Sequence, residues 1–166
     1  LMAGRPFGIN VGRVDEVASV PDGTLPVLPV ALSVPSLPGK PDARNAAAVI
    51  AAIEFATRLA ISGEASAIVT NPIAKRTLYE AGFTHPGHTE FLGELATRAV
   101  GRPVTPIMML ASDALRVVPA TVHVPLRDVP GLLTIDRLLA VATITAEALR
   151  TDFAVPHPRL AVAGLN

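Results

Sequence analysis

Two short segments of the chain combine residue types that can do chemistry. The first is Gly87-His88-Thr89-Glu90-Phe91-Leu92, and the second runs from Thr121 to Asp128 and contains His123. Each places a histidine beside hydroxyl or carboxylate groups at a turn, which apolar packing alone does not require. The chain has four histidines and no cysteine. These two histidines therefore carry most of the functional signal.

The first segment has the composition of an anion-binding helix start. A helix N-terminus with free N–H groups attracts phosphate or carboxylate, and Gly87 would let a ligand approach the backbone closely. His88 could hydrogen-bond a substrate oxygen, and Thr89 could cap the helix. The alternative is an ordinary capping turn, with Thr89 as the cap and His88 exposed without a ligand.

His123 and Lys75 are the other candidates. His123 follows an apolar run, and neutral imidazole is the commonest metal ligand. A core histidine bonded to backbone is the competing interpretation, because metal sites usually have three or more protein ligands and no HxH or HExxH spacing occurs. Lys75, on the first turn of a predicted helix, could contact a phosphate or act in proton transfer if buried. A solvated lysine is the plainer alternative.

The remaining polar groups favour structural roles. His85 and His157 are predicted to lie at the surface, and Arg127 with Asp128 is predicted to form a local salt bridge. The sequence contains neither a P-loop nor a GxGxxG motif. The usual dinucleotide-binding fingerprint is therefore missing.

Composition narrows the class of protein. The 166 residues fit one domain and are 50% hydrophobic but only 4% aromatic, so a core must be built mainly from Ala, Val, Leu and Ile. Zero formal net charge gives no electrostatic footprint for nucleic acid or an anionic membrane. No apolar run approaches the roughly 20 residues of a membrane span. Without cysteine there is no disulfide framework, which is compatible with the cytoplasmic location that we expect.

The positions of apolar residues and helix caps predict an α/β protein with a largely parallel sheet flanked by helices. Asp42 is a good cap for a helix reaching Ile61, in which Glu54 and Arg58 would pair. Thr134 is expected to cap a helix with apolar positions up to Leu149. The other predicted helices cover 75–80 and 89–100, and the predicted strands cover 25–32, 65–70, 105–111, 115–122 and 159–165. We expect one partial domain, with a Pro-rich, loosely packed segment 1–41 and a core at 42–166.

In colinear order, several motifs resemble the 4-hydroxythreonine-4-phosphate dehydrogenase family of pyridoxal phosphate biosynthesis. They extend over about residues 25–166 and are Pro38-Gly39-Lys40, Ile68-Val69-Thr70-Asn71-Pro72 with Lys75, Ala81-Gly82-Phe83, Pro86-Gly87-His88-Thr89-Glu90-Phe91-Leu92, Met108-Met109-Leu110-Ala111, Leu115-Arg116-Val117 and His123-Val124-Pro125-Leu126-Arg127-Asp128. The closing Ala163-Gly164-Leu165-Asn166 is similar to the start of the family's Gly-Leu-Asn-Pro-His-Ala-Gly-Glu stretch.

The resemblance implies a fold like that of isocitrate and isopropylmalate dehydrogenases and a homodimer. It implies oxidation of the secondary alcohol of 4-phosphohydroxy-L-threonine with NAD or NADP, followed by loss of carbon dioxide. His88 and Thr89 would bind substrate, and His123 would be one of three histidines on a divalent metal ion (Zn, Mg or Co). The metal would stabilise negative charge on the substrate oxygen. Lys75 is a further candidate for proton transfer or phosphate contact.

Several departures from the family pattern affect these expectations. The family's Gly-Asp-Pro-Ala-Gly-Ile-Gly-Pro-Glu opening and the other two metal histidines are absent, so we expect a fragment that is inactive alone. Asn71 and Ala74 differ from many relatives and suggest a divergent branch acting on a related hydroxy acid, while Pro119 interrupts the strand before His123. A non-catalytic α/β binding or interaction module is the alternative. The enzyme interpretation requires the His88–Thr89 pair and His123 to face a common cleft.

Overall fold

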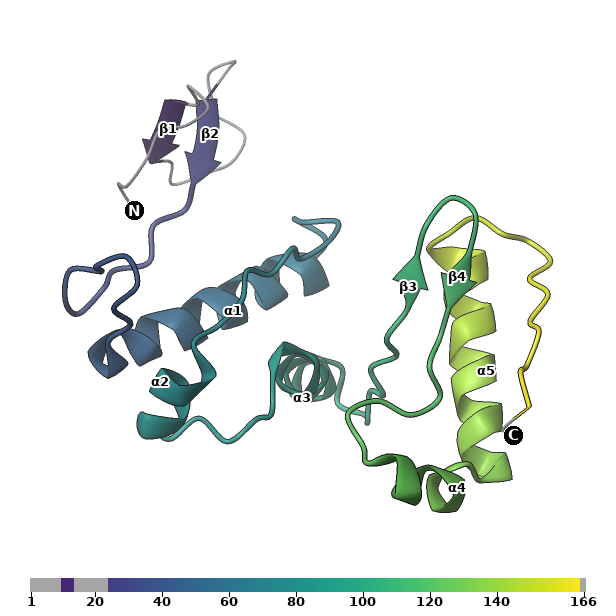
Figure 1. Cartoon of the computed structure of the whole chain (residues 1–166). Coiled ribbons are helices and arrows are strands. Elements are labelled where there is room, and N and C mark those ends of the chain that lie inside the picture. Colours follow the sequence, from purple (N-terminus) through teal and green to yellow (C-terminus); the bar gives the residue numbers. More distant parts are fainter. Residues whose placement is uncertain (1–9, 14–23, 165–166) are drawn as a thin grey trace. The chain divides into compact units, whose positions relative to one another are not determined.

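The computed structural model describes residues 10–13 and 24–164, which form two compact units that divide between Val104 and Thr105 (Figure 1). The first unit holds β1 (Asn10–Arg13), β2 (Thr24–Val27), the 3-10 helix η2 (Ala43–Asn45), α1 (Ala46–Ile61), α2 (Lys75–Glu80) and α3 (His88–Val100). The second holds β3 (Leu110–Ala111), β4 (Arg116–Val117), the 3-10 helix η3 (Leu126–Asp128), α4 (Val129–Leu132) and α5 (Ile135–Thr151).

The two N-terminal strands form a small parallel pair, with Asn10 opposite Thr24 and Arg13 opposite Val27. The predicted strand at 25–32 is therefore confirmed only in its first half. β2 ends two residues before Pro29, which cannot donate a backbone hydrogen bond to a neighbouring strand. The expectation that 1–41 packs loosely falls partly on residues outside the described ranges, namely 1–9 and 14–23.

Asp42 begins the first long helix, as predicted. Its Oδ1 accepts a hydrogen bond from the backbone N–H of Arg44 at 2.9 Å, so the first turn is the 3-10 helix η2 and the α-helix follows from Ala46. The Arg44 guanidinium also binds this carboxylate, and these hydrogen bonds lower the pKa of Asp42 from its ordinary 3.8 to about 2. The charged carboxylate is therefore the form that caps the helix.

The predicted Glu54–Arg58 pair is wrong. Among the ion pairs of the described residues none joins these two side chains, and the Arg58 guanidinium instead lies 4.9 Å from the centroid of the Phe55 ring. A cation over an aromatic face gains electrostatic attraction while its methylene groups cover apolar surface. Arg58 therefore contacts the ring of Phe55, about one helical turn earlier in α1, instead of the carboxylate of Glu54.

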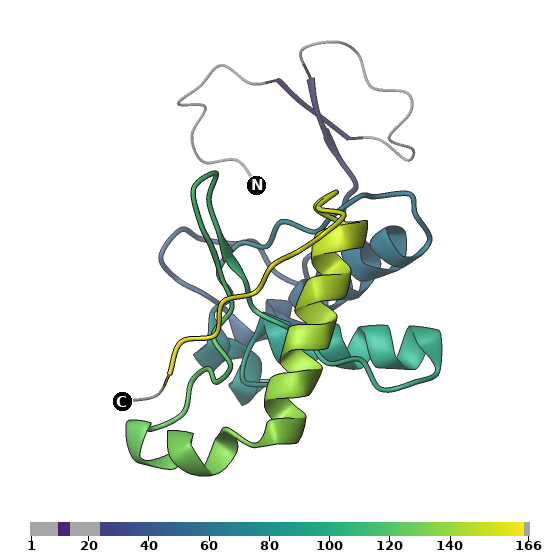
Figure 2. The ribbon, with the colours of Figure 1, turned by 90° about the vertical axis from the view of Figure 1, so that its right-hand side faces the viewer.

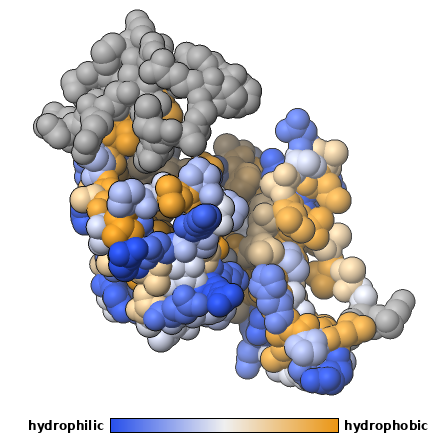
Figure 3. Space-filling model, turned by 60° about the vertical axis from the view of Figure 1, so that its left-hand side comes forward, coloured by the Kyte–Doolittle hydropathy of each residue, from blue (hydrophilic) through white to orange (hydrophobic). Residues whose placement is uncertain are grey.

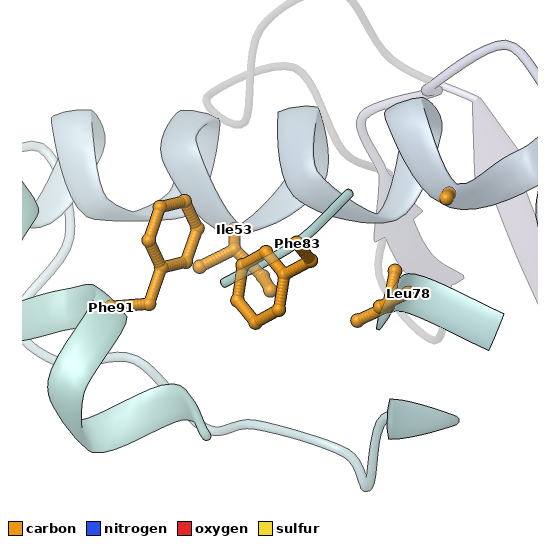
Figure 4. Close-up of a cluster of buried hydrophobic side chains, with 5 residues drawn as sticks. Ile53, Leu78, Phe83 and Phe91 are labelled. Carbon is orange, nitrogen blue, oxygen red and sulfur yellow. The ribbon is translucent and has the colours of Figure 1, made fainter. Parts of the chain in front are cut away.

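The core of the first unit lies where α1, α2 and α3 meet (Figure 4). Phe83 and Phe91 are buried in edge-to-face contact, with ring centroids 5.1 Å apart, and they point toward α1, which carries Ile53. Leu78 from α2 is 2% exposed and completes the cluster together with Ala46. This core fixes the first turn of α3, because Phe91 lies three residues after His88.

The second unit consists of the short antiparallel hairpin β3–β4 and the helix α5, with α4 before it. Thr134 caps α5 as predicted, since its Oγ1 accepts from the backbone N–H of Arg137 at 3.2 Å. The guanidinium of Arg116 on β4 lies 5.2 Å from the Phe153 ring centroid, which joins the hairpin to the end of α5. Within the predicted strands 105–111 and 115–122, only residues 110–111 and 116–117 form strands.

The predicted strands at 65–70 and 159–165 are wrong for the residues described. Both segments are extended without ladder hydrogen bonds, and Figure 2 shows the chain after α5 returning in this form. Val69 is 94% exposed and Val162 is 77% exposed, although a short apolar run of this kind is typical of buried strands. A strand needs a neighbour for its N–H and C=O groups, and these segments have none among residues 10–13 and 24–164.

The chain is an α/β protein with five α-helices and two two-stranded sheets in its described part. The largely parallel sheet expected from the sequence is not formed by these residues. Apolar side chains lie at the surface (Figure 3, orange). The exposed residues of the second unit include Leu110, Leu139 and Leu160. No single described helix is long and apolar enough to cross a membrane. Only Leu126–Leu132 and Ile135–Thr151, bent at 87°, reach that length together.

Candidate functional site

The structure brings Lys75 to the start of α3. Lys75 is the first residue of α2, as predicted, and its Nζ lies 3.6 Å from the position that a Cβ on Gly87 would occupy. The Glu90 carboxylate oxygen Oε2 lies 3.4 Å from the same position. A cation and a carboxylate thus both lie close to Gly87. A ligand that enters here meets both charges.

Gly87, rather than Thr89, is the N-cap of α3. No side chain caps the helix, and the backbone of Gly87 is extended, with φ of −174° and ψ of −168°. The prediction that Thr89 is the cap is therefore wrong, because Thr89 is the second helical residue and is exposed. His88 is the first helical residue and is half-buried. The first N–H groups of α3 are left to a ligand or to water.

His85 lies in the turn before this helix and is not the surface residue expected from the sequence. Its ring packs 5.1 Å from Phe83 and 4.9 Å from Phe91, measured between centroids. Its Nε2 lies 3.2 Å from Oε2 of Glu94, and its side chain is only 20% exposed. This contact was not predicted from the sequence. His85 lies in the turn before α3 and Glu94 lies on α3 nine residues later, and neither a helical nor a strand period links the two.

His123 belongs to the second unit and lies in a bend six residues after β4 ends, so it does not directly end a strand as predicted. Its side chain is exposed, and its backbone is left-handed, with φ of 54°. Only glycine adopts this region without steric cost. The preceding segment is held by Arg137, whose Nε donates to the carbonyl oxygen of Ala120 at 2.9 Å.

The loop after His123 keeps its predicted local ion pair, with Arg127 Nε 3.6 Å from Asp128 Oδ1. His157 is exposed, as predicted. Across the described ranges, no group of three or more histidine, aspartate or glutamate side chains is arranged to hold a metal ion. The residues described here therefore do not by themselves form a metal site. The expectation that His88, Thr89 and His123 face one cleft joins two separately described units and stays a prediction.

An open depression of about 300 Å³ lies between α1 and α3 and contains none of the predicted site residues. It is lined by Glu54, Thr57, Arg58, Ile61, Leu95, Arg98 and Ala99. The candidate site is thus the start of α3 rather than this depression.

Comparison with protein families decides the relationship. The family described as "Pyridoxal phosphate biosynthetic protein PdxA" matches residues 7–166, nearly the whole chain. This chain belongs to the PdxA family. The resemblance inferred from the short motifs is therefore confirmed, and the PdxA match includes Lys75, His88, Thr89 and His123.

Individual PdxA relatives are similar over most of the chain. The 4-hydroxythreonine-4-phosphate dehydrogenase of Maricaulis maris (strain MCS10) is 53% identical over 154 residues, which are 91% of this chain and 45% of the relative. That of Methylorubrum extorquens (strain PA1) is 50% identical over 154 residues, covering 92% of this chain and 44% of the relative. The chain thus spans somewhat less than half the length of these relatives.

Solved structures agree. The crystal structure of 4-hydroxythreonine-4-phosphate dehydrogenase from Klebsiella pneumoniae gives a TM-score of 0.84 at 33% identity, over 95% of this chain and 48% of that chain. A putative enzyme of the same name from Salmonella typhimurium gives 0.83 at 30% identity, over 95% and 49%. The PdxA assignment thus rests on fold as well as on sequence.

Proposed function

We propose that the protein is a 4-hydroxythreonine-4-phosphate dehydrogenase, which oxidises and decarboxylates 4-phosphohydroxy-L-threonine or a closely related hydroxy acid with NAD or NADP and a divalent metal ion. One observation carries the proposal beyond family membership. The ammonium group of Lys75 stands beside the uncapped start of α3, next to His88 and Thr89. This arrangement suits an anionic substrate, because the N–H groups and the cation both attract negative charge.

Each residue has a role within this proposal. His88 and Thr89 contact the substrate, the imidazole through a ring nitrogen and the threonine through its hydroxyl group. Lys75 is exposed, which favours contact with a phosphate or carboxylate over proton transfer, since no burial removes the ammonium from water. The Glu90 carboxylate disfavours a second negatively charged group beside Gly87.

His123 contributes one ligand to the metal ion in this proposal. Its side chain is exposed, and its left-handed backbone is a strained conformation of the kind that clusters at functional sites. A bound metal would polarise the substrate oxygen. Because the described residues do not complete a metal site, we assign no step of the reaction to particular metal ligands besides His123.

The same proposal includes the finer fold and the assembly. We propose that a protein as long as the relatives has a fold like that of isocitrate and isopropylmalate dehydrogenases. The exposed apolar side chains of the described residues, among them Val69 and Val162, support this, because burying such side chains is favourable. We further propose a homodimer.

The test is an assay of the full-length protein with 4-phosphohydroxy-L-threonine, following reduction of NAD and of NADP with and without a chelator. His88→Ala and Thr89→Val should each lower kcat/KM about tenfold or more, the effect of removing a hydrogen bond to a charged substrate. His157→Ala, an exposed histidine in another loop, is the matched control. Rates that are indifferent to chelator remove the metal role of His123, and no turnover of this substrate by the wild type refutes the proposal.

A further inference from the structure

The turn that leads into the candidate site is held from two sides. On one side, the Tyr79 hydroxyl of α2 donates to the carbonyl oxygen of Pro86 at 3.3 Å. On the other, Nε2 of His85 meets Oε2 of Glu94 on α3 at 3.2 Å. Gly87 and His88 follow this turn directly. The contacts that hold Pro86 and His85 in place therefore also hold the first residues of α3 in place.

The His85 ring is part of the hydrophobic core as well as of a polar contact. It touches Phe83, 8% exposed, and Phe91, 4% exposed, and these two rings touch each other. Phe91 in turn donates its backbone N–H to the Gly87 carbonyl at 3.3 Å, the first hydrogen bond of α3. One imidazole thus links the core cluster to the residue that begins the helix.

The charged groups around His85 make its orientation specific. Glu94 receives His85 on one carboxylate oxygen and Arg98 on the other. The carboxylate therefore has a partner on each of its two oxygens. Replacing the imidazole removes the polar contact of His85 and leaves the Glu94–Arg98 pair in place.

We propose that His85 is a positioning residue for the His88–Thr89 pair, acting through Glu94 and through the aromatic contacts with Phe83 and Phe91. It sets where the first turn of α3 begins and thereby where these two side chains stand. The substrate part of this inference rests on the proposed function. The positioning part does not, because it concerns the hydrogen bond between Phe91 and Gly87.

Two variants remove the polar contact of His85 and keep its aromatic contacts. Both leave a side chain of similar size in place, so neither opens a cavity. His85→Phe keeps an aromatic ring against Phe83 and Phe91 but has no nitrogen for Glu94. Glu94→Gln keeps the shape of the partner side chain and removes its charge. Arg76→Gln is the matched control, because Arg76 forms an exposed pair with Glu80 at 3.0 Å in the same unit.

The first measurement is amide hydrogen exchange in the full-length protein. Both variants should raise the exchange rate of the Phe91 amide about tenfold while amides in the middle of α1 keep their rates, which is the pattern of a local opening rather than a global loss of stability. The double variant should add nothing to either single change, because both act through one contact. Unchanged Phe91 exchange, or equal acceleration throughout α1, overturns the proposal.

The second measurement is binding of 4-phosphohydroxy-L-threonine by the same proteins. A displaced His88–Thr89 pair should weaken binding about tenfold in both variants, with the control unchanged, because small misplacements of contacting groups have effects of this size. Wild-type binding that both variants retain in full overturns the substrate part. If the wild type does not bind this compound, the proposed function fails, and the Phe91 exchange still decides whether His85 positions α3.

Discussion

Replacing His123 with glycine should make the protein more stable and less able to bind metal. A residue other than glycine with φ near 54° carries a steric cost of about 1–2 kcal/mol. Glycine loses about 0.5–1 kcal/mol through its greater freedom in the unfolded chain. Because the His123 side chain is exposed, little packing is lost. The net expectation is a stabilisation of about 0.5–1 kcal/mol.

The chain offers a matched control at Ala154, which is also exposed and has φ of 52° after the end of α5. Ala154→Gly should stabilise the protein by a similar amount. Urea unfolding measures both, and a gain of this size should raise the midpoint by about 0.3–0.5 M if the slope is near 2 kcal/mol/M and unchanged. The two variants should differ in one respect, since only His123→Gly removes a proposed metal ligand.

Three results would count against this reasoning. A destabilised His123→Gly beside a stabilised Ala154→Gly would mean that the imidazole makes a structural contact, so that the left-handed backbone is not the dominant effect. If both variants are equally stabilised and His123→Gly leaves the metal affinity of the full-length protein unchanged, His123 is not a metal ligand. Loss of metal affinity in the Ala154 variant would mean that the assay reports stability instead of ligation.

Three further predictions concern the scaffold. Leu78→Ala, at the most buried position of the first unit, should destabilise that unit by about 2–5 kcal/mol, measured by urea unfolding, whereas a loss below 1 kcal/mol would contradict the core assignment. Thr134→Ala should cost about 1 kcal/mol by removing the cap of α5, and Thr134→Ser should restore most of it. Asp42 has a pKa below its unfolded value, so its contribution to stability is present above about pH 4 and is lost as the pH falls toward 2. Asp42→Asn should therefore flatten the pH dependence of the unfolding midpoint in that window, and an unaltered profile would count against the ion pair.

The helices of this protein are determined locally, and the sequence predicts them well. Asp42 and Thr134 each accept a hydrogen bond from a backbone N–H two or three residues ahead, so the start of a helix depends on adjacent residues alone. Gly101 ends α3 for a similarly local reason, with a left-handed φ of 69°. Pro72, expected in the first turn of a helix, instead lies three residues before α2 begins. The colinear short motifs, taken together, likewise indicated the family that the comparison confirms.

What depends on distant partners could not be read from the sequence. The short apolar runs around Val69 and Val162 indicate strands, but a strand exists only where another segment supplies its hydrogen bonds, and the described residues do not. Two contacts depend on how α2, the following turn and α3 pack around Phe83 and Phe91. They are the approach of Lys75 to Gly87 and the contact between His85 and Glu94. Residue types and spacing determined the family and the candidate groups, whereas tertiary packing alone decided which of those groups meet, because contacts across a chain reversal have no period in the sequence.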